Sequence, residues 1–133
     1  MTAELRMLLL STAFGMLHII LTAHSASHQR GYRWTASPRD HPVLPLTGVA
    51  GRVERGLENF QETFPFFVCA VLLAHILDVH NSYTEAGAML YFWGRVAYLP
   101  LYAFGVRIVR SIAWNIATIG IVLIIAATFM ERW

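Results

Sequence analysis

The segment Arg52-Val-Glu-Arg-Gly-Leu-Glu-Asn-Phe-Gln-Glu-Thr-Phe-Pro65 leads directly into an apolar run, residues 64–77. At about 100° per residue, four of its polar side chains fall within an arc of roughly 80° on a helix: Arg52, Arg55, Asn59 and Glu62. Ionisable side chains at the edge of lipid hydrocarbon must face protein, water or one another, because exposing them to lipid costs several kcal/mol. The segment therefore predicts the mouth of a membrane helix, with a candidate binding site on one face.

The composition is typical of an integral membrane protein. Of the 133 residues, 56% are hydrophobic and 14% are charged, which is too apolar for an ordinary soluble domain. Crossing about 30 Å of hydrocarbon takes roughly 20 helical residues. Four stretches reach that length: 5–23, 48–77, 86–106 and 112–130. We therefore predict an all-α integral membrane protein, with residues 1–133 forming a single four-transmembrane-helix bundle.

The first stretch also has features of a cleaved leader, because Arg6 precedes an apolar segment that ends near Ala26. Its apolar part has the length of a membrane span, and the remaining chain needs it to complete an even bundle. We expect this segment to be retained as a span.

The placement of the arginines predicts how the chain is oriented. Five of them lie between the apolar parts of the first two spans and two lie between the last two spans, whereas residues 78–85 contain none. By the positive-inside rule, the two arginine-bearing connections face the cytoplasm and both termini lie outside. Because the arginines sit at helix mouths rather than in a basic stripe, we expect no binding of nucleic acid.

The third predicted span carries an arginine near its middle. Arg95 is unfavourable there by about 2.5 to 3.5 kcal/mol unless it has a partner inside the bundle. We predict a structural ion pair between Arg95 and Glu62, with Glu58 as the second choice. Tyr98 and Tyr102 follow Arg95 on the same helical face.

Antiparallel packing brings the starts of spans two and four and the end of span three to one membrane edge. Arg107-Ile-Val-Arg110-Ser111 precedes the fourth apolar stretch, where free backbone N–H groups and the positive end of the helix dipole add to the arginines. The residues alone therefore predict an anion site that faces the cytoplasm. Two simpler interpretations stay open: the polar face of span two could be a network that locks helices together, and tyrosines also favour membrane interfaces.

Two other classes of site have little support in the sequence. Of the six histidines, His24 and His28 have helical i, i+4 spacing, but no third ligand completes a metal set, so we expect no metal. A transporter or channel subunit is disfavoured because no span has paired helix breaks or a chain of ionisable residues across the bilayer.

Three motifs in this order resemble those of the MAPEG superfamily, the membrane-associated proteins of eicosanoid and glutathione metabolism, and its bacterial members in particular. The motifs are Arg52-x-x-Arg55 with Asn59, Glu62 and Pro65, then Gly94-Arg95-Val-Ala-Tyr98 with Tyr102, then Arg110-Ser111. The resemblance implies a homotrimer in the cell inner membrane. It also implies that glutathione, as co-substrate, binds between neighbouring protomers at the cytoplasmic side.

The resemblance also implies roles for individual residues. Arg110 matches the arginine that stabilises the glutathione thiolate, which makes it the expected catalytic residue, and Arg95 matches a buried arginine that braces the second helix. The expected glutathione contacts are Arg52, Arg55, Asn59, Glu62, Tyr98, Tyr102, Arg107 and Ser111. The expected substrate is a lipophilic electrophile or hydroperoxide that arrives from membrane lipid.

The chemistry of the arginines agrees with this expectation. A free thiol with a pKa near 8.5 is mostly protonated at pH 7, and a guanidinium stabilises the thiolate without accepting its proton. We therefore expect a glutathione transferase or peroxidase. The alternative is a non-catalytic lipid-binding or scaffolding protein of the same fold, which Leu57 and Glu58 suggest because eicosanoid-handling members usually carry other residues there.

Overall fold

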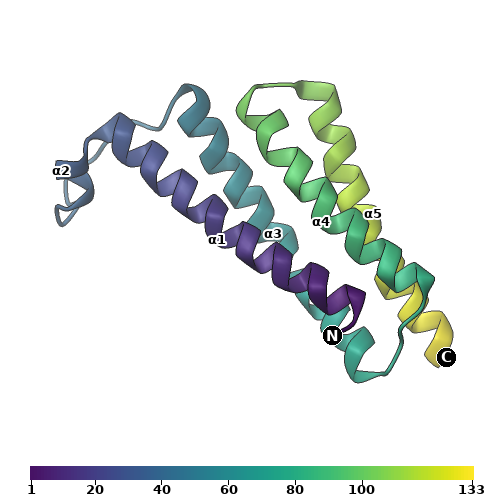
Figure 1. Ribbon diagram of the computed structural model, residues 1–133. Helices are drawn as coiled ribbons and strands as arrows, with labels where there is room; N and C mark the ends of the chain where they lie inside the picture. The colour runs from purple at the N-terminus through teal and green to yellow at the C-terminus, as the bar shows by residue number, and fades with distance from the viewer.

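The computed structural model describes all 133 residues and contains helices and no strands. Four long helices and one single-turn helix follow one another along the chain (Figure 1): α1 (Ala3–Arg30), α2 (Tyr32–Thr35), α3 (Gly48–Ile76), α4 (Ser82–Ala103) and α5 (Arg107–Arg132). The all-α prediction is confirmed. Three helices, α1, α3 and α5, are long and apolar enough to cross a membrane. The helix α4 is not among these three, and it carries Arg95 and four tyrosines.

Several helix boundaries differ from the predicted spans. The helix α1 continues to Arg30, although its span was predicted to end at residue 23. The helix α4 covers Ser82–Ala103 rather than 86–106, because a capping box at Asn81 starts it early. Gly105, with φ of 76°, then turns the chain, so α5 already begins at Arg107 instead of residue 112.

The long helices run antiparallel in sequence order. Both chain ends and the α3–α4 connection lie at one end of the molecule, whereas α2 and the turn between α4 and α5 lie at the other (Figure 1). The starts of α3 and α5 therefore share an end with the last turn of α4. This is the arrangement that the candidate site requires.

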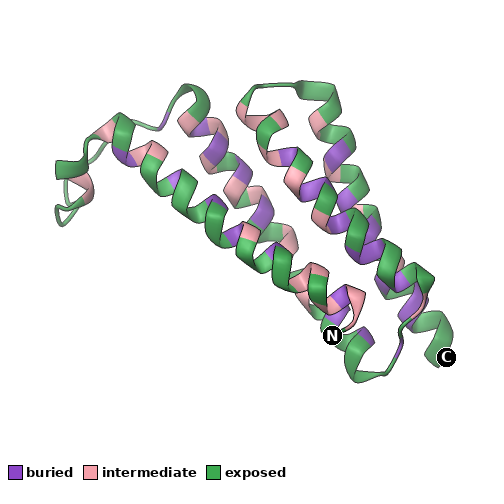
Figure 2. Ribbon diagram, in the orientation of Figure 1, coloured by how far each residue is buried: buried purple, intermediate pink, exposed green.

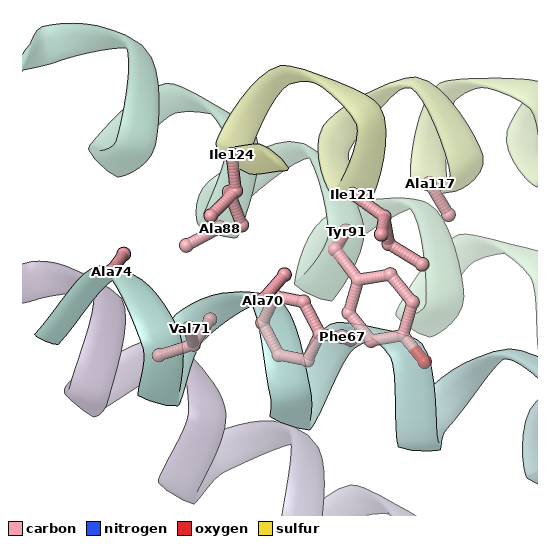
Figure 3. Packing of buried hydrophobic residues seen from close by; sticks show 9 residues of the cluster. All are labelled: Phe67, Ala70, Val71, Ala74, Ala88, Tyr91, Ala117, Ile121 and Ile124. Carbon is pink, nitrogen blue, oxygen red and sulfur yellow. The ribbon is translucent and has the colours of Figure 1, made fainter. Parts of the chain in front are cut away.

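The core lies where α3 meets α4 and α5 (Figure 3). Its nine buried residues are Phe67, Ala70, Val71, Ala74, Ala88, Tyr91, Ala117, Ile121 and Ile124. The rings of Phe67 and Tyr91 stack with centroids 3.9 Å apart, which joins α3 to α4. Between α4 and α5 the backbones themselves touch, since a Cβ on Gly87 would lie 2.6 Å from the carbonyl oxygen of Gly120.

Polar contacts hold together the end of the bundle that carries the termini. Glu4, which is buried in α1, accepts a hydrogen bond from the Thr84 hydroxyl of α4 at 2.6 Å and pairs with His80 at 3.3 Å. The ring of His80 in turn lies 3.2 Å, nitrogen to nitrogen, from His75 at the end of α3. This cluster joins three helices at the end opposite the candidate site.

Much of each long helix is exposed (Figure 2), and many of the exposed side chains are large and apolar. Only 30 of the 133 residues are buried, and large apolar side chains such as Phe66, Ile119 and Val122 face outward. Soluble monomers rarely expose apolar patches of this extent. Lipid or a partner surface is therefore the natural environment of these faces.

Candidate functional site

Two adjacent pockets open at the end where α3 and α5 begin and α4 ends. The first, which we call the mixed lobe, has a volume of about 480 Å³. Its wall is formed by Arg55, Glu58, Asn59 and Glu62 from α3, Tyr98 and Tyr102 from α4, and Arg110, Ser111, Trp114 and Asn115 from α5. This volume is within the range of small-molecule sites.

The second pocket, which we call the arginine lobe, has a volume of about 580 Å³. Its wall contains Arg52, Arg55, Tyr102, Gly105, Arg107, Ile108, Arg110, Ser111, Ile112 and Asn115. The two lobes share five of these residues, including Arg55, Tyr102 and Arg110. They are therefore neighbouring parts of one depression.

Helical spacing explains why α3 supplies four polar side chains to the mixed lobe. Glu58 and Asn59 follow Arg55 by three and four residues, and Glu62 follows them by four and three, so the four side chains lie on one face of α3. The opposite face of the same turns contacts α1, where the ring of His18 packs near Gly56 and the His18 Nε2 lies 3.2 Å from the Val53 carbonyl oxygen. Contact with α1 on one side leaves the polar face open to the pocket.

Tyr102 holds two arginines from different helices. The Arg55 Nε donates a hydrogen bond to the Tyr102 hydroxyl at 3.3 Å, and the Arg110 guanidinium lies over the Tyr102 ring, 4.4 Å from its centroid. The ring of Tyr102 is itself stacked on Tyr98, with centroids 5.5 Å apart. Two guanidinium groups therefore converge on one wall, although α3 and α5 supply them from distant parts of the chain.

Arg95 lies in the interior, with 2% of its surface exposed. Its Nη1 donates to Asn59 Oδ1 at 2.7 Å and its Nη2 donates to the Thr63 hydroxyl, while the guanidinium also lies over the rings of Tyr91 and Tyr98. The predicted ion pair with Glu62 does not form in this structure, where the hydrogen-bond partners of Arg95 are Asn59 and Thr63 and the one ion pair joins His80 and Glu4.

A geometric reason accounts for this difference. Asn59 and Thr63 are four residues apart, so they lie one turn apart on the same face of α3, and the Arg95 side chain of α4 reaches both. Glu62 is on the pocket-facing side of the helix and lines the mixed lobe. Arg95 thus holds Asn59 in place, and Glu62 is left for a ligand.

The two lobes differ in charge. In the mixed lobe, Glu58 and Glu62 balance the two arginines. The wall of the arginine lobe contains four arginines and no acidic residue. Arg52 also stabilises the end of α4. Its Nε donates a hydrogen bond at 2.8 Å to the Ala103 carbonyl oxygen, which has no partner within the helix.

The MAPEG family model matches residues 7–130 of the chain. The chain belongs to the MAPEG family. Comparison with curated proteins and with solved structures found no match. The MAPEG family includes glutathione transferases and related proteins, and the matched residues include both lobes. Membership and the three apolar helices together make this chain a membrane protein.

The structure brings most of the predicted MAPEG site residues into the mixed lobe. These are Arg55, Asn59, Glu62, Tyr98, Tyr102, Arg110 and Ser111. Arg52 and Arg107 line only the arginine lobe, so their contact with glutathione stays a prediction from resemblance. No group of three or more His, Cys, Asp or Glu side chains in this MAPEG chain is placed to hold a metal ion.

Sequence reasoning missed two residues of the MAPEG pocket, Trp114 and Asn115. Each lies one helical turn after a predicted residue, Arg110 and Ser111 respectively, so i, i+4 spacing could have found them. The Asn115 side chain donates to the Ser111 carbonyl at 2.8 Å. The indole N–H of Trp114 has no partner within the protein, which leaves it as a donor for a ligand.

Proposed function

We propose that this MAPEG protein is a membrane-bound glutathione transferase or peroxidase, and that glutathione binds in the mixed lobe. The observation that carries this proposal is the convergence of Arg55 and Arg110 on Tyr102, in a pocket whose wall also carries the carboxylates of Glu58 and Glu62. Glutathione has two carboxylates, one ammonium group and a thiol. A wall of mixed charge matches those groups, with arginines for the carboxylates and a glutamate for the ammonium.

Arg110 is the proposed catalytic residue. It lies in the first turn of α5, at the positive end of that helix, and it forms no hydrogen bond or ion pair within the protein. Stacking on Tyr102 leaves the N–H edge of its guanidinium free. A thiol placed at that edge would lose its proton more readily, because the guanidinium stabilises the thiolate and cannot itself take up the proton.

The thiolate then reacts in one of two ways. In the transferase reaction its sulfur forms a bond to an electrophilic carbon, and the leaving group departs with the electron pair or the product takes up a proton. In the peroxidase reaction the sulfur attacks the O–O bond, which releases an alcohol and leaves a sulfenic acid. A second glutathione converts that acid to a disulfide and water. Exposed apolar faces on α1, α3 and α5 support delivery of a lipophilic substrate from membrane lipid.

The proposal includes four membrane-spanning helices, with α4 as the fourth, assembled as a homotrimer in the inner membrane. The antiparallel arrangement supports the orientation, because both arginine-bearing connections lie at the same end as the two lobes (Figure 1). By the positive-inside rule this end faces the cytoplasm and the termini lie outside.

A non-catalytic lipid-binding or scaffolding role is the second candidate. Glu58 favours it, because this second carboxylate on the wall of the mixed lobe lies beside the expected glutathione site and reduces its attraction for anions.

Thermal unfolding in mild detergent tests the two candidates. Millimolar glutathione should raise the unfolding midpoint through mass action, and S-methyl glutathione, which lacks an ionisable thiol, should raise it less. Arg110→Ala should abolish conjugation of a soluble aryl halide, and Arg33→Ala, which removes an exposed arginine from α2, should not. If neither glutathione nor S-methyl glutathione shifts the midpoint and lipid co-purifies in stoichiometric amount, the second candidate replaces the first.

A further inference from the structure

The arginine lobe has a chemistry that the proposed glutathione site does not use. Four guanidinium groups surround a pocket of about 580 Å³, and no carboxylate in its wall balances them. Arg55 and Arg110 belong to the shared wall, whereas Arg52 and Arg107 belong to this lobe alone. Four like charges on one concave wall are unfavourable without an anion, so the lobe is electrostatically incomplete on its own.

Arg52 is positioned to receive a ligand rather than to pair within the protein. Its Nε is committed to the Ala103 carbonyl, which fixes the plane of the guanidinium and leaves the two terminal nitrogens free of any partner. The Gly105 turn lies against it, since a Cβ at that glycine would be 3.9 Å from the guanidinium carbon. The terminal N–H groups of Arg52 are therefore held in place and still have donors to offer.

The rim of this lobe is apolar. Ile108 and Ile112 from α5 line it, and Ile108 is 77% exposed. A small soluble anion would leave these apolar side chains uncovered, whereas the acyl chains of a lipid anion can pack against them. The lobe also opens at the membrane edge, the level at which lipid headgroups lie.

We propose that the arginine lobe binds the phosphate headgroup of an anionic phospholipid, with the acyl chains against the Ile108 and Ile112 side of α5. The phosphate oxygens accept hydrogen bonds from Arg52 and Arg107, and bidentate contact with a guanidinium is favoured for phosphate. This assignment replaces the glutathione contact expected of Arg52 and Arg107. It does not depend on the thiol chemistry, because Arg52 and Arg107 line the arginine lobe alone.

The test is thermal unfolding of the full chain in lipid nanodiscs of two compositions, phosphatidylcholine alone or with increasing phosphatidylglycerol. Phosphatidylglycerol should raise the unfolding midpoint of the wild type by several degrees. The double variant Arg52→Gln/Arg107→Gln should lose more than half of that rise. The matched control Arg33→Gln/Arg39→Gln removes the same charge from the connection that precedes α3, outside the lobe, and should keep the rise.

Three results would overturn the proposal. An equal loss in the control variant means that the effect is general attraction between arginines and an anionic bilayer. A full rise with soluble glycerol phosphate in phosphatidylcholine discs means that the lobe takes a free anion and the acyl chains do not matter. If the double variant loses both the glutathione shift, measured in phosphatidylcholine discs, and the lipid effect, the two lobes form one glutathione site.

A second measurement covers the case in which loss of the Arg52 bond to Ala103 prevents folding. The single variant Arg107→Gln changes an exposed side chain that has no partner in the protein. Native mass spectrometry should find fewer retained phosphatidylglycerol molecules on this variant than on Arg33→Gln, and equal retention would refute the site. Failure of glutathione to shift the wild type would refute the proposed function and leave the lipid result standing.

Discussion

Arg95 is a buried charge whose two hydrogen-bond partners, Asn59 and Thr63, are neutral. The expectation that a buried arginine pairs with an acidic residue fails here, because the helical positions of Asn59 and Thr63 bring these two side chains, and not Glu62, within reach of Arg95. The result matters for the site, since Asn59 is positioned by Arg95 and Glu62 stays free. The polar face of α3 therefore makes two kinds of contact: Asn59 and Thr63 accept hydrogen bonds from Arg95 in the interior, and Glu62 lines the pocket.

Arg95→Leu should destabilise the protein by about 1 to 3 kcal/mol, because Asn59 Oδ1 and the Thr63 hydroxyl each lose the hydrogen bond that Arg95 donates. Arg95→Lys should recover little of this loss, since one ammonium cannot span both acceptors as a planar guanidinium does. Unfolding in detergent, followed by circular dichroism, measures both variants. An Arg95→Lys variant as stable as the wild type would contradict the two-acceptor geometry.

Tyr102→Phe removes the hydroxyl that accepts from Arg55 but keeps the ring that lies under Arg110. We expect it to weaken glutathione binding by about 0.5 to 1.5 kcal/mol, the value of one hydrogen bond. Tyr102→Leu, which also removes the ring, should weaken binding further. Titration calorimetry gives both values, and Tyr83→Phe, an exposed tyrosine at the other end of α4, is the control.

At the scale of helices, α4 and α5 approach closely enough for their backbones to touch, and glycine is what permits this. Because α4 carries Tyr98 and Tyr102 and α5 carries Arg110, this packing also sets the distance between the tyrosine pair and the proposed catalytic arginine. Contact at Gly87 and Gly120 is far from the pocket but fixes the geometry of its wall.

Gly87→Val should therefore lower stability by about 1 to 3 kcal/mol through overpacking, since its Cβ would lie 2.6 Å from the Gly120 carbonyl oxygen. Ala86→Val, one residue earlier on the exposed side of α4, provides the matched control. Thermal unfolding in detergent compares the two. Equal midpoints for both variants would show that the helices can separate without cost.

At the scale of the whole molecule, the sequence predicted the helical class, the antiparallel order and the end at which the site lies. Helical periodicity grouped Arg55, Asn59 and Glu62, and in the structure all three line the mixed lobe. Helix ends were harder, because the Asn81 capping box and the Gly105 turn moved the boundaries of α4. The division into two lobes depends on how three helices meet around Tyr102, and no local pattern encodes such a long-range junction.

Arg110 is proposed to turn the thiol of glutathione bound in the mixed lobe into a thiolate. The most direct test of this role is the ultraviolet absorbance of the thiolate, measured as glutathione is added to the purified protein across a range of pH. We expect bound glutathione to ionise at a lower pH than free glutathione, and we expect Arg110→Ala to abolish this shift while Arg33→Ala keeps it. Each unit by which the pKa falls represents about 1.4 kcal/mol of thiolate stabilisation. An unshifted thiol in the wild type, or a full shift in Arg110→Ala, would contradict the account.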